Sequence, residues 1–268
     1  MASGPIYVAN NLVFSAGASA LSSNNEDPDF PLEGLIDFDP FPQAKVKTVA
    51  ANDWFKCDFG AAKSFGFVAF INTNPQEQDQ MYFQANSTDS WGSPSVDQVL
   101  TQTVDSLLLP IEAAPRIFFH EFSSTQSYRW VRAINKGGQA DGPWGIGEWW
   151  VGTKVQLNRP PAYPYQDNFI TPKSVVMPDG GSPGVNLLGS PVRQFSPRWI
   201  SIQPADILQL EAMQVKANLT SRRMLWRPDS SKNDVFMVHM LGDIRTTEKD
   251  INNRDITALD LEALQPGL

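Results

Sequence analysis

Proline and glycine recur along the whole sequence and divide it into short segments. The 268 residues include 21 Pro and 18 Gly, and proline inside a helix removes a backbone hydrogen bond and clashes with the preceding turn. Short apolar and aromatic segments lie between these turn-forming residues. This arrangement predicts an all-β protein of one large or two ordinary domains.

Three segments carry clear strand patterns. "DWFKCDFG" (53–60) alternates polar with apolar residues, which is the period of a strand with one buried face. "SFGFVAFINTN" (64–74) is apolar on both faces, as expected of a central strand. "YRWVRAIN" (128–135) also alternates. Together they predict a β-sandwich in the first half of the chain.

The second half has a different character. Residues 155–190 are rich in proline and tyrosine, and strands are expected at 234–243 and 255–264. The best helix candidate is 204–218, with Pro204 at its start. We therefore predict a sandwich domain at 1–155 and a smaller β-rich domain with this helix at 156–268.

The charge is distributed unequally between these parts. Residues 1–155 hold 9 Lys and Arg against 17 Asp and Glu, a net of −8, whereas residues 156–268 hold 12 of each, a net of 0. An acidic or neutral domain does not attract a phosphate backbone. Nucleic acid is therefore not an expected partner.

Other classes of protein and site are disfavoured by what the sequence lacks. Cys57 is the single cysteine, so no intrachain disulfide is expected. The first residues lack the pattern of a secretion signal, and no window of eighteen apolar residues predicts membrane insertion. The two histidines, His120 and His239, lie in apolar segments without a nucleophile motif. We expect no catalytic residues, no enzyme activity and no cofactor.

Four motifs in order give the first half a family resemblance. They are "FPLEGLIDFDPFPQAK" (30–45), "DWFKCDFG", "YRWVRAIN" and "GEWWVG" (147–152). The sequence resembles the galactose-binding-like, or discoidin-type, domain, which implies a jelly-roll β-sandwich. Phe59 stands where that family usually has Leu, and Phe38 where Gly is common. The second departure weighs against a calcium ion bound in that loop.

A second resemblance covers the whole chain. The opening "ANNL" (9–12), the sandwich, and a second module with "SPRWISIQ" (196–203), "MLWRPDSS" (224–231) and "ITALDLEAL" (256–264) are similar to a group of bacteriophage tail proteins. The resemblance implies a virion structural component at the tail tip or baseplate. Its expected partners are other virion proteins and further copies of itself in a homo-oligomeric ring. The implied location is the virion tail, after synthesis in the host cytoplasm.

The segment "GIGEWWVG" (145–152) admits three interpretations. It is a carboxylate beside two indoles, a sugar-binding platform, or a core strand. Strand alternation places Trp149 and Val151 on one face and Glu148 with Trp150 on the other, so the two indoles cannot form one platform. The favoured interpretation is the closing strand of the sandwich, with Glu148 paired to Arg129 or Arg132.

Aromatic side chains in the loops are the candidate ligand contacts. Tryptophans at the ends of a sandwich are suited to stacking on a sugar, to contacts with a partner protein, or to packing within the domain. The candidates for carbohydrate or partner binding are Trp91, Trp144 and Trp150. A host-surface glycan is the alternative partner, for an adhesion module.

Two charged groups complete the candidates. Asp37 and Asp39 lie in an acidic loop, but their spacing does not match a calcium loop, so no metal is predicted. A basic cluster around one indole is the candidate assembly patch, expected to dock on an acidic partner surface or on the acidic half of a neighbouring copy. Alternatively, its last arginine pairs with Asp229. The patch consists of Arg222, Arg223, Trp226 and Arg227.

Overall fold

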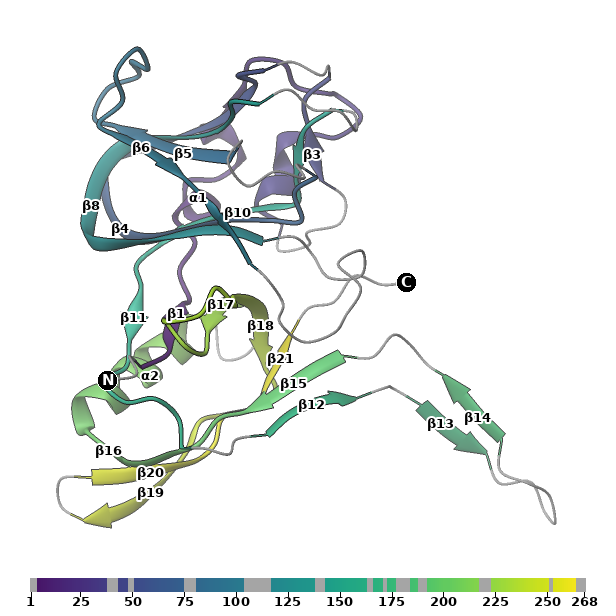
Figure 1. Cartoon of the computed structure of the whole chain (residues 1–268), viewed down its shortest axis with the longest axis vertical. Coiled ribbons are helices and arrows are strands. Elements are labelled where there is room, and N and C mark those ends of the chain that lie inside the picture. The colour runs from purple at the N-terminus through teal and green to yellow at the C-terminus, as the bar shows by residue number, and fades with distance from the viewer. Residues whose placement is uncertain are drawn as a thin grey trace.

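The computed structural model describes twelve stretches of the chain, and β-strands dominate them. Two seven-stranded sheets and three smaller ones account for most of the ordered backbone (Figure 1). The described residues are 4–37, 43–47, 51–74, 81–103, 117–137, 143–162, 166–170, 173–176, 184–187, 192–216, 223–250 and 253–263.

Two long strands build the sandwich of the first half. Strands β4 (Trp54–Ile71) and β8 (Ile117–Asn135) pair antiparallel along almost their whole length. Their register shifts between Asp58 and Lys63 and again between Phe65 and Phe67. Both strands bend in this region, so each contributes to both layers of the sandwich (Figure 1).

Shorter strands complete each layer. The upper layer adds β2 (Leu21–Ser23), β5 (Met81–Asn86) and β6 (Val96–Val99). The lower layer adds β7 (Thr101–Gln102) and β10 (Glu148–Gly152). The aromatic core between the layers includes Phe55, Cys57, Phe83, Phe70, Phe118 and Trp149.

Small elements close one end of this sandwich. They are α1 (Leu12–Ala16), the 3-10 turns η1 (Ala18–Ala20) and η2 (Leu32–Leu35), and the pair β3 (Ala44–Lys45) and β9 (Gly145–Ile146). Asn11 caps α1, because its side-chain oxygen accepts a hydrogen bond from the Val13 amide at 3.0 Å. Its Nδ2 donates to the Trp149 carbonyl at 2.9 Å, which ties the helix to β10.

The sheet of the second half takes its strands from both ends of the chain. The N-terminal strand β1 (Ile6–Val8) pairs with β11 (Val155–Gln156) on one side and β17 (Met224–Arg227) on the other. The sheet continues through β18 (Phe236–Met240), β21 (Leu261–Ala263), β15 (Val192–Ser196) and β12 (Gln166–Ile170).

Three further groups surround this sheet. Helix α2 (Pro204–Lys216) packs beneath it, and β16 (Trp199–Ile202), β20 (Asn253–Ala258) and β19 (Arg245–Asp250) form a three-stranded sheet. Strands β13 (Lys173–Val176) and β14 (Gly184–Leu187) pair with each other and project from the body as an arm (Figure 1).

The lower layer of the sandwich is buried on both faces. In β4, Val68 and Phe70 point into the sandwich core, whereas Phe67, Ala69 and Ile71 point the opposite way. This second set packs against β1, β17 and β18 of the other sheet. The shared core consists of Ile6, Val8, Phe67, Ala69, Ile71, Ile117, Phe119, Trp150, Leu225, Val235 and Met237.

The fold class expected from the sequence is confirmed. The chain is a β-sandwich followed by a β-rich part with one 13-residue helix, which begins at the predicted Pro204. The segment 64–74 is apolar on both faces because the second sheet covers the face turned away from the sandwich. Strand β1 pairs with β17 of the second half, although the residues that follow β1 in the sequence belong to the sandwich.

Trp150→Ala tests the contribution of the shared core. Trp150 is fully buried there, so we expect a loss of about 3 to 5 kcal/mol in the free energy of unfolding, measured by denaturant titration. Ile200→Ala is the matched control at a side chain that is 59% exposed, and it should change stability by no more than about 0.5 kcal/mol. A loss below about 1 kcal/mol for Trp150→Ala would contradict this burial.

Candidate binding surface

The upper layer turns one face away from the core, and a row of polar side chains crosses it. The row runs from Lys56 on β4 to Arg132 on β8, Gln84 on β5 and Asp97 on β6, each directly opposite the next in the strand register. Their neighbours along the strands point into the sandwich core, which fixes this set on the outer face. Residues distant in the sequence thereby meet in one line.

Aromatic rings flank this row. The Trp91 ring lies over the Arg132 guanidinium, with 4.4 Å from Cζ to the ring centroid. Lys56 Nζ lies 5.1 Å from the rings of both Trp54 and Trp130. Each of these three rings is partly exposed. We name this set, together with Tyr82 under Lys136 and the polar row, the outer-face cluster.

Among the described residues, acidic groups neutralise three cations on or beside this face. Lys56 pairs with Asp89 at 2.7 Å, and Lys136 pairs with Asp97 at 2.7 Å. Arg129 donates from Nε and Nη2 to the two carboxylate oxygens of Asp58, both at 2.7 Å. This bidentate hydrogen bond lowers the pKa of Asp58 below its ordinary value.

Arg132, the cation at the centre of the polar row, has a different environment. Its Nε donates to Gln84 Oε1 at 2.8 Å and its Nη2 donates to the same oxygen. Gln84 Nε2 in turn donates to Asp97. Trp91 is held over this arrangement because its Nε1 donates to Asp89 Oδ1 at 2.6 Å. The cluster thus combines partly exposed aromatic side chains with fixed donors and acceptors, the groups that orient a polar ligand with an apolar side.

The structure places the three candidate tryptophans in different environments. Trp91 is partly exposed on the outer face. Trp144 is 1% exposed and packs 4.8 Å from the Phe55 ring, and Trp150 is 0% exposed in the shared core. The ligand-contact role expected for Trp144 and Trp150 is therefore wrong, because neither ring reaches the surface.

The candidate assembly patch is not an exposed patch. Trp226 is fully buried between Tyr7 and Phe195, with ring centroids at 6.5 and 4.5 Å. Arg227 is 8% exposed, and Arg223 is partly exposed. Arg222 lies outside the described residues. The expectation of a docking surface at Trp226 and Arg227 is wrong, because these side chains are used within the chain.

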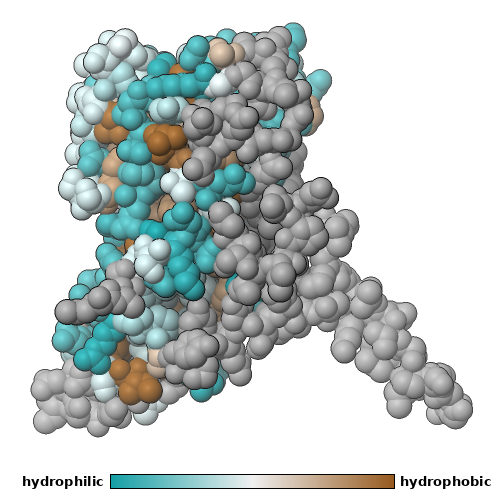
Figure 2. Space-filling view, viewed as in Figure 1, coloured by the Kyte–Doolittle hydropathy of each residue, from teal (hydrophilic) through white to brown (hydrophobic). Residues whose placement is uncertain are grey.

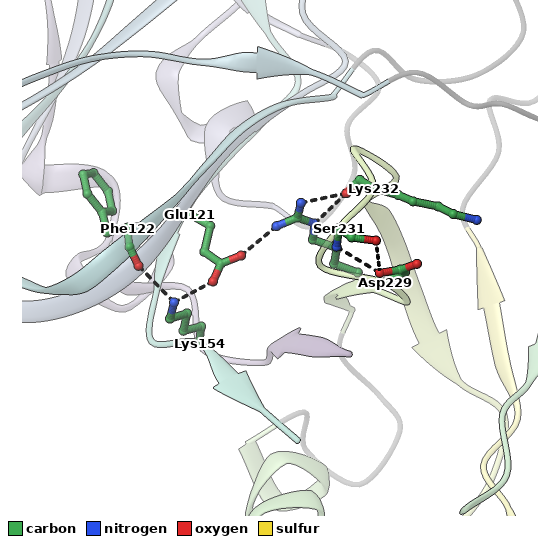
Figure 3. Close-up of polar contacts among 7 residues, drawn as sticks. Glu121, Phe122, Lys154, Asp229, Ser231 and Lys232 are labelled. Atoms are coloured by element: carbon green, nitrogen blue, oxygen red, sulfur yellow. Dashed lines mark hydrogen bonds and ion pairs between the residues drawn. The ribbon is translucent and has the colours of Figure 1, made fainter. Parts of the chain in front are cut away.

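Arg227 instead joins the two halves of the same molecule through Glu121, which Figure 3 shows together with Lys154 and Lys232. Its Nη1 donates to Glu121 Oε2 on β8 at 2.6 Å, and its Nε and Nη2 donate to the Lys232 carbonyl at 2.9 and 2.7 Å. Lys154 Nζ donates to the other Glu121 oxygen at 2.6 Å and to the Phe122 carbonyl at 2.9 Å. Asp229, the predicted partner of Arg227, accepts instead from the amide and hydroxyl of Ser231.

Glu148 is buried but has a different neighbour from the one expected. Asn11 Nδ2 lies 3.4 Å from Glu148 Oε1. Arg129 binds Asp58 and Arg132 binds Gln84, so neither is the predicted partner of Glu148. The strand interpretation of "GIGEWWVG" is confirmed, and its Trp149 and Trp150 face opposite cores.

The last glycine of that segment has a packing role. A Cβ on Gly152 would lie 2.2 Å from the Asn10 carbonyl oxygen. Asn10 Oδ1 also accepts from the amide and hydroxyl of Thr153, at 3.1 and 2.8 Å. The N-terminal segment therefore passes directly against β10 where the chain crosses between its halves, and only glycine leaves room for it.

Two predictions from the sequence remain, that Asp37 and Asp39 form no metal site and that no segment crosses a membrane. Asp37 is described, but Asp39 lies outside the described residues, so this pair is not placed. Within the stretches that the structure describes, no group of three or more His, Cys, Asp and Glu side chains is arranged to hold a metal ion. No helix among the same residues has the length and apolar character needed to cross a membrane.

Comparisons with known proteins give no family for this chain. No protein-family model and no curated protein sequence matches this chain. Among solved structures, it is similar to chitosan-binding module 1 of a chitosanase/glucanase from Paenibacillus sp. IK-5, at 13% identity over 53% of this chain and 98% of that one, with a TM-score of 0.39.

Two further solved structures cover a similar share of the chain. The lectin domain of lectinolysin complexed with Lewis B antigen is 12% identical, over 54% of this chain and 96% of that one, with a TM-score of 0.40. A fucose-binding module of Streptococcus pneumoniae is 12% identical, over 54% and 98%, with a TM-score of 0.39. At these identities and scores, the similarity assigns neither a ligand nor a site to this chain.

Arg227→Ala tests the link between the halves. Without this side chain, the largely buried carboxylate of Glu121 loses its ion pair with Arg227. We therefore expect a loss of roughly 3 kcal/mol in the free energy of unfolding. Arg129→Ala removes an ion pair whose arginine is 44% exposed, and it should lower the free energy of unfolding much less than Arg227→Ala does. Denaturant titration compares the two variants, and equal losses would contradict the bridging role of Arg227.

Proposed function

We propose that this chain is a non-enzymatic carbohydrate-recognition protein, and that its ligand lies on the outer-face cluster. The observation that carries the proposal is the gathering of Trp54, Trp91, Trp130 and Tyr82, all partly exposed, beside ordered charged and amide groups. Apolar ring faces stack on the C–H faces of sugar rings, and fixed polar groups bind the hydroxyls.

The arrangement of the layers supports the choice of this face. The opposite face of the sandwich packs on the second sheet through the shared core, so it offers no surface to a ligand. Of the three tryptophans considered as ligand contacts, Trp91 is the one at the surface. Its loop is held by the Lys56–Asp89 ion pair and by the Trp91–Asp89 hydrogen bond, which limits the conformational entropy lost on binding.

The proposal includes no catalysis. His120 on β8 is partly buried against the Phe122 ring at 4.7 Å, and burial lowers the pKa of its imidazole. His239 lies 3.6 Å from Glu262 on the neighbouring strand β21. Both histidines lie outside the outer-face cluster, so the proposed site is a binding surface alone.

Trp91→Ala tests the glycan site. If the ring forms the centre of the site, the dissociation constant for a bound glycan should rise at least tenfold, as expected for a central aromatic contact. A glycan array identifies the ligand and calorimetric titration measures its affinity. Trp91→Phe keeps a ring face and should retain most of the affinity, and Leu241→Ala serves as a distant surface control.

Two results would contradict this proposal. One is the absence of binding to every glycan of a panel that includes neutral and charged sugars. The other is a bound glycan whose affinity is the same for Trp91→Ala as for the unmodified chain. Thermal unfolding of each variant separates a lost contact from a lost fold.

A second candidate function is a structural component of a bacteriophage virion, at the tail tip or baseplate. The arm of β13 and β14 favours it, because this hairpin projects from the body (Figure 1) and pairs within the described residues only with itself. Projecting hairpins with unpaired strand edges are suited to contacts with neighbouring subunits. The resemblance of the sequence to tail proteins supports the same assignment, with other virion proteins as partners.

Mass spectrometry of purified particles tests the second candidate. If the chain is a tail component, its peptides should co-purify with intact virions in a fixed ratio to the tail-tube subunit. The absence of such peptides would contradict it. The two candidates are compatible, because a virion protein can carry a glycan-binding face.

A further inference from the structure

Helix α2 carries two apolar stripes rather than one. Ile207, Leu210 and Met213 are buried against the second sheet. A second stripe is exposed to solvent, and in it Leu208 and Val215 are 64% and 68% exposed. This exposed seam consists of Ala205, Leu208, Ala212 and Val215, at successive spacings of three, four and three residues.

The spacing of the exposed seam is that of a helix that packs against another helix. Apolar residues that alternate at three and four positions occupy the a and d sites of a heptad, which form the contact between paired helices. Ala205 and Ala212 fall at a, and Leu208 and Val215 at d. The small alanines allow the two helix axes to approach closely.

The body of the protein holds α2 in place for such a contact. Its inner stripe packs into the core, and Gln214 Nε2 donates to Asp243 Oδ1 at 2.8 Å. Asn158 Nδ2 donates to the buried Asp206 at 2.7 Å in the first turn of the helix. A partner would therefore meet a helix that is already folded, and association would cost no helix formation.

The charges beside the exposed seam identify the partner as a second copy of this chain. Glu211 falls at the g site and Lys216, five residues later, at the following e site. In a parallel pair of helices, a g residue lies beside the e residue five positions on in its neighbour. Glu211 of each copy would then face Lys216 of the other, whereas an antiparallel pair would bring the two Glu211 side chains together.

We propose that two copies of this chain associate through the exposed seam of α2, with their helices parallel. The helix of 13 residues is about 20 Å long, so the seam forms a small interface and the association depends on concentration. The proposal is independent of the glycan site, because the outer-face cluster belongs to the first half of the chain.

Sedimentation equilibrium on the full chain tests this interface. As the concentration of the unmodified chain is raised towards about 1 mM, an increasing fraction of it should be dimeric. Leu208→Glu should weaken the association at least tenfold, because it places two carboxylates in the apolar contact. Leu241→Glu is the matched control at another exposed apolar residue, 45% exposed and outside the helix, and it should leave the association unchanged. Far-UV circular dichroism confirms that each variant is folded.

Two further variants test the parallel arrangement. Glu211→Lys should weaken the dimer about two- to fivefold, and the addition of Lys216→Glu should restore it, because the pair is then reversed. Val215→Cys should form a disulfide with itself on oxidation, since position 215 faces its own copy in a parallel pair. In an antiparallel pair it would face position 205, about 15 Å along the helix. Cys57 is buried and does not compete.

Three results together support the proposal. Leu208→Glu weakens the dimer, the addition of Lys216→Glu restores the dimer that Glu211→Lys weakened, and Val215→Cys cross-links the two copies. A chain that stays monomeric at all concentrations overturns it, as does association that Leu208→Glu leaves unchanged. Failure of Val215→Cys to cross-link a dimer overturns the parallel arrangement.

Discussion

The apolar layer between the two sheets determines which surfaces of this molecule are available. Strand β4 places alternate side chains into two cores, with Phe70 in one and Phe67 in the other. Trp150 on β10 and Phe119 on β8 extend the second core towards β17 and β18. Because apolar burial is the main favourable term in folding, the lower layer of the sandwich gains stability from both sides.

Polar contacts at the edge of this layer fix the halves in one orientation. Arg227 reaches from β17 to Glu121 on β8, and its guanidinium lies 5.1 Å from the Phe119 ring. Glu121 also binds Lys154, so one carboxylate accepts from both sides of the junction (Figure 3). A charged group that is largely removed from water requires such partners, and their directionality restricts the relative movement of the sheets.

The proposed functions lie on the surfaces that the second sheet does not cover. One face of the sandwich is used to hold the molecule together, and the outer-face cluster lies on the opposite layer. On the face that Figure 2 shows, the apolar residues among those described occur in small separate patches between hydrophilic ones. Recognition is therefore assigned to partly exposed rings with ordered polar neighbours, such as Trp91 with Arg132. Helix α2 and the arm of β13 and β14 leave further surface for contacts between proteins.

Local patterns in the sequence predicted much of the fold. The alternation in "DWFKCDFG" placed Phe55 and Cys57 in the core and Lys56 outside it, as found. The double-sided apolar segment 64–74 indicated a central strand, and the proline at 204 marked the start of the helix. These features depend on neighbours a few residues apart. The division into domains at residue 155 stays a prediction, with β1 paired to the second half.

The junction between the halves and the outer-face cluster both depend on contacts that no local pattern contains. Arg227 and Glu121 are 106 positions apart, and Arg132 and Gln84 are 48 apart. Trp144 and Trp150 looked like loop and strand-end residues, but their burial follows from packing against Phe55 and against the second sheet. Strand register brought the outer-face cluster together, and register is set by the whole sheet.

Hydrogen exchange of the native chain under increasing denaturant tests the shared core most directly. If the layer between the sheets couples the two halves, the amides of β4 in the sandwich and of β17 and β18 in the second sheet should open in one step, with the same free energy and the same denaturant dependence. If the strands of one half exchange at a clearly lower free energy, while those of the other stay protected, the halves are independent and the account is contradicted.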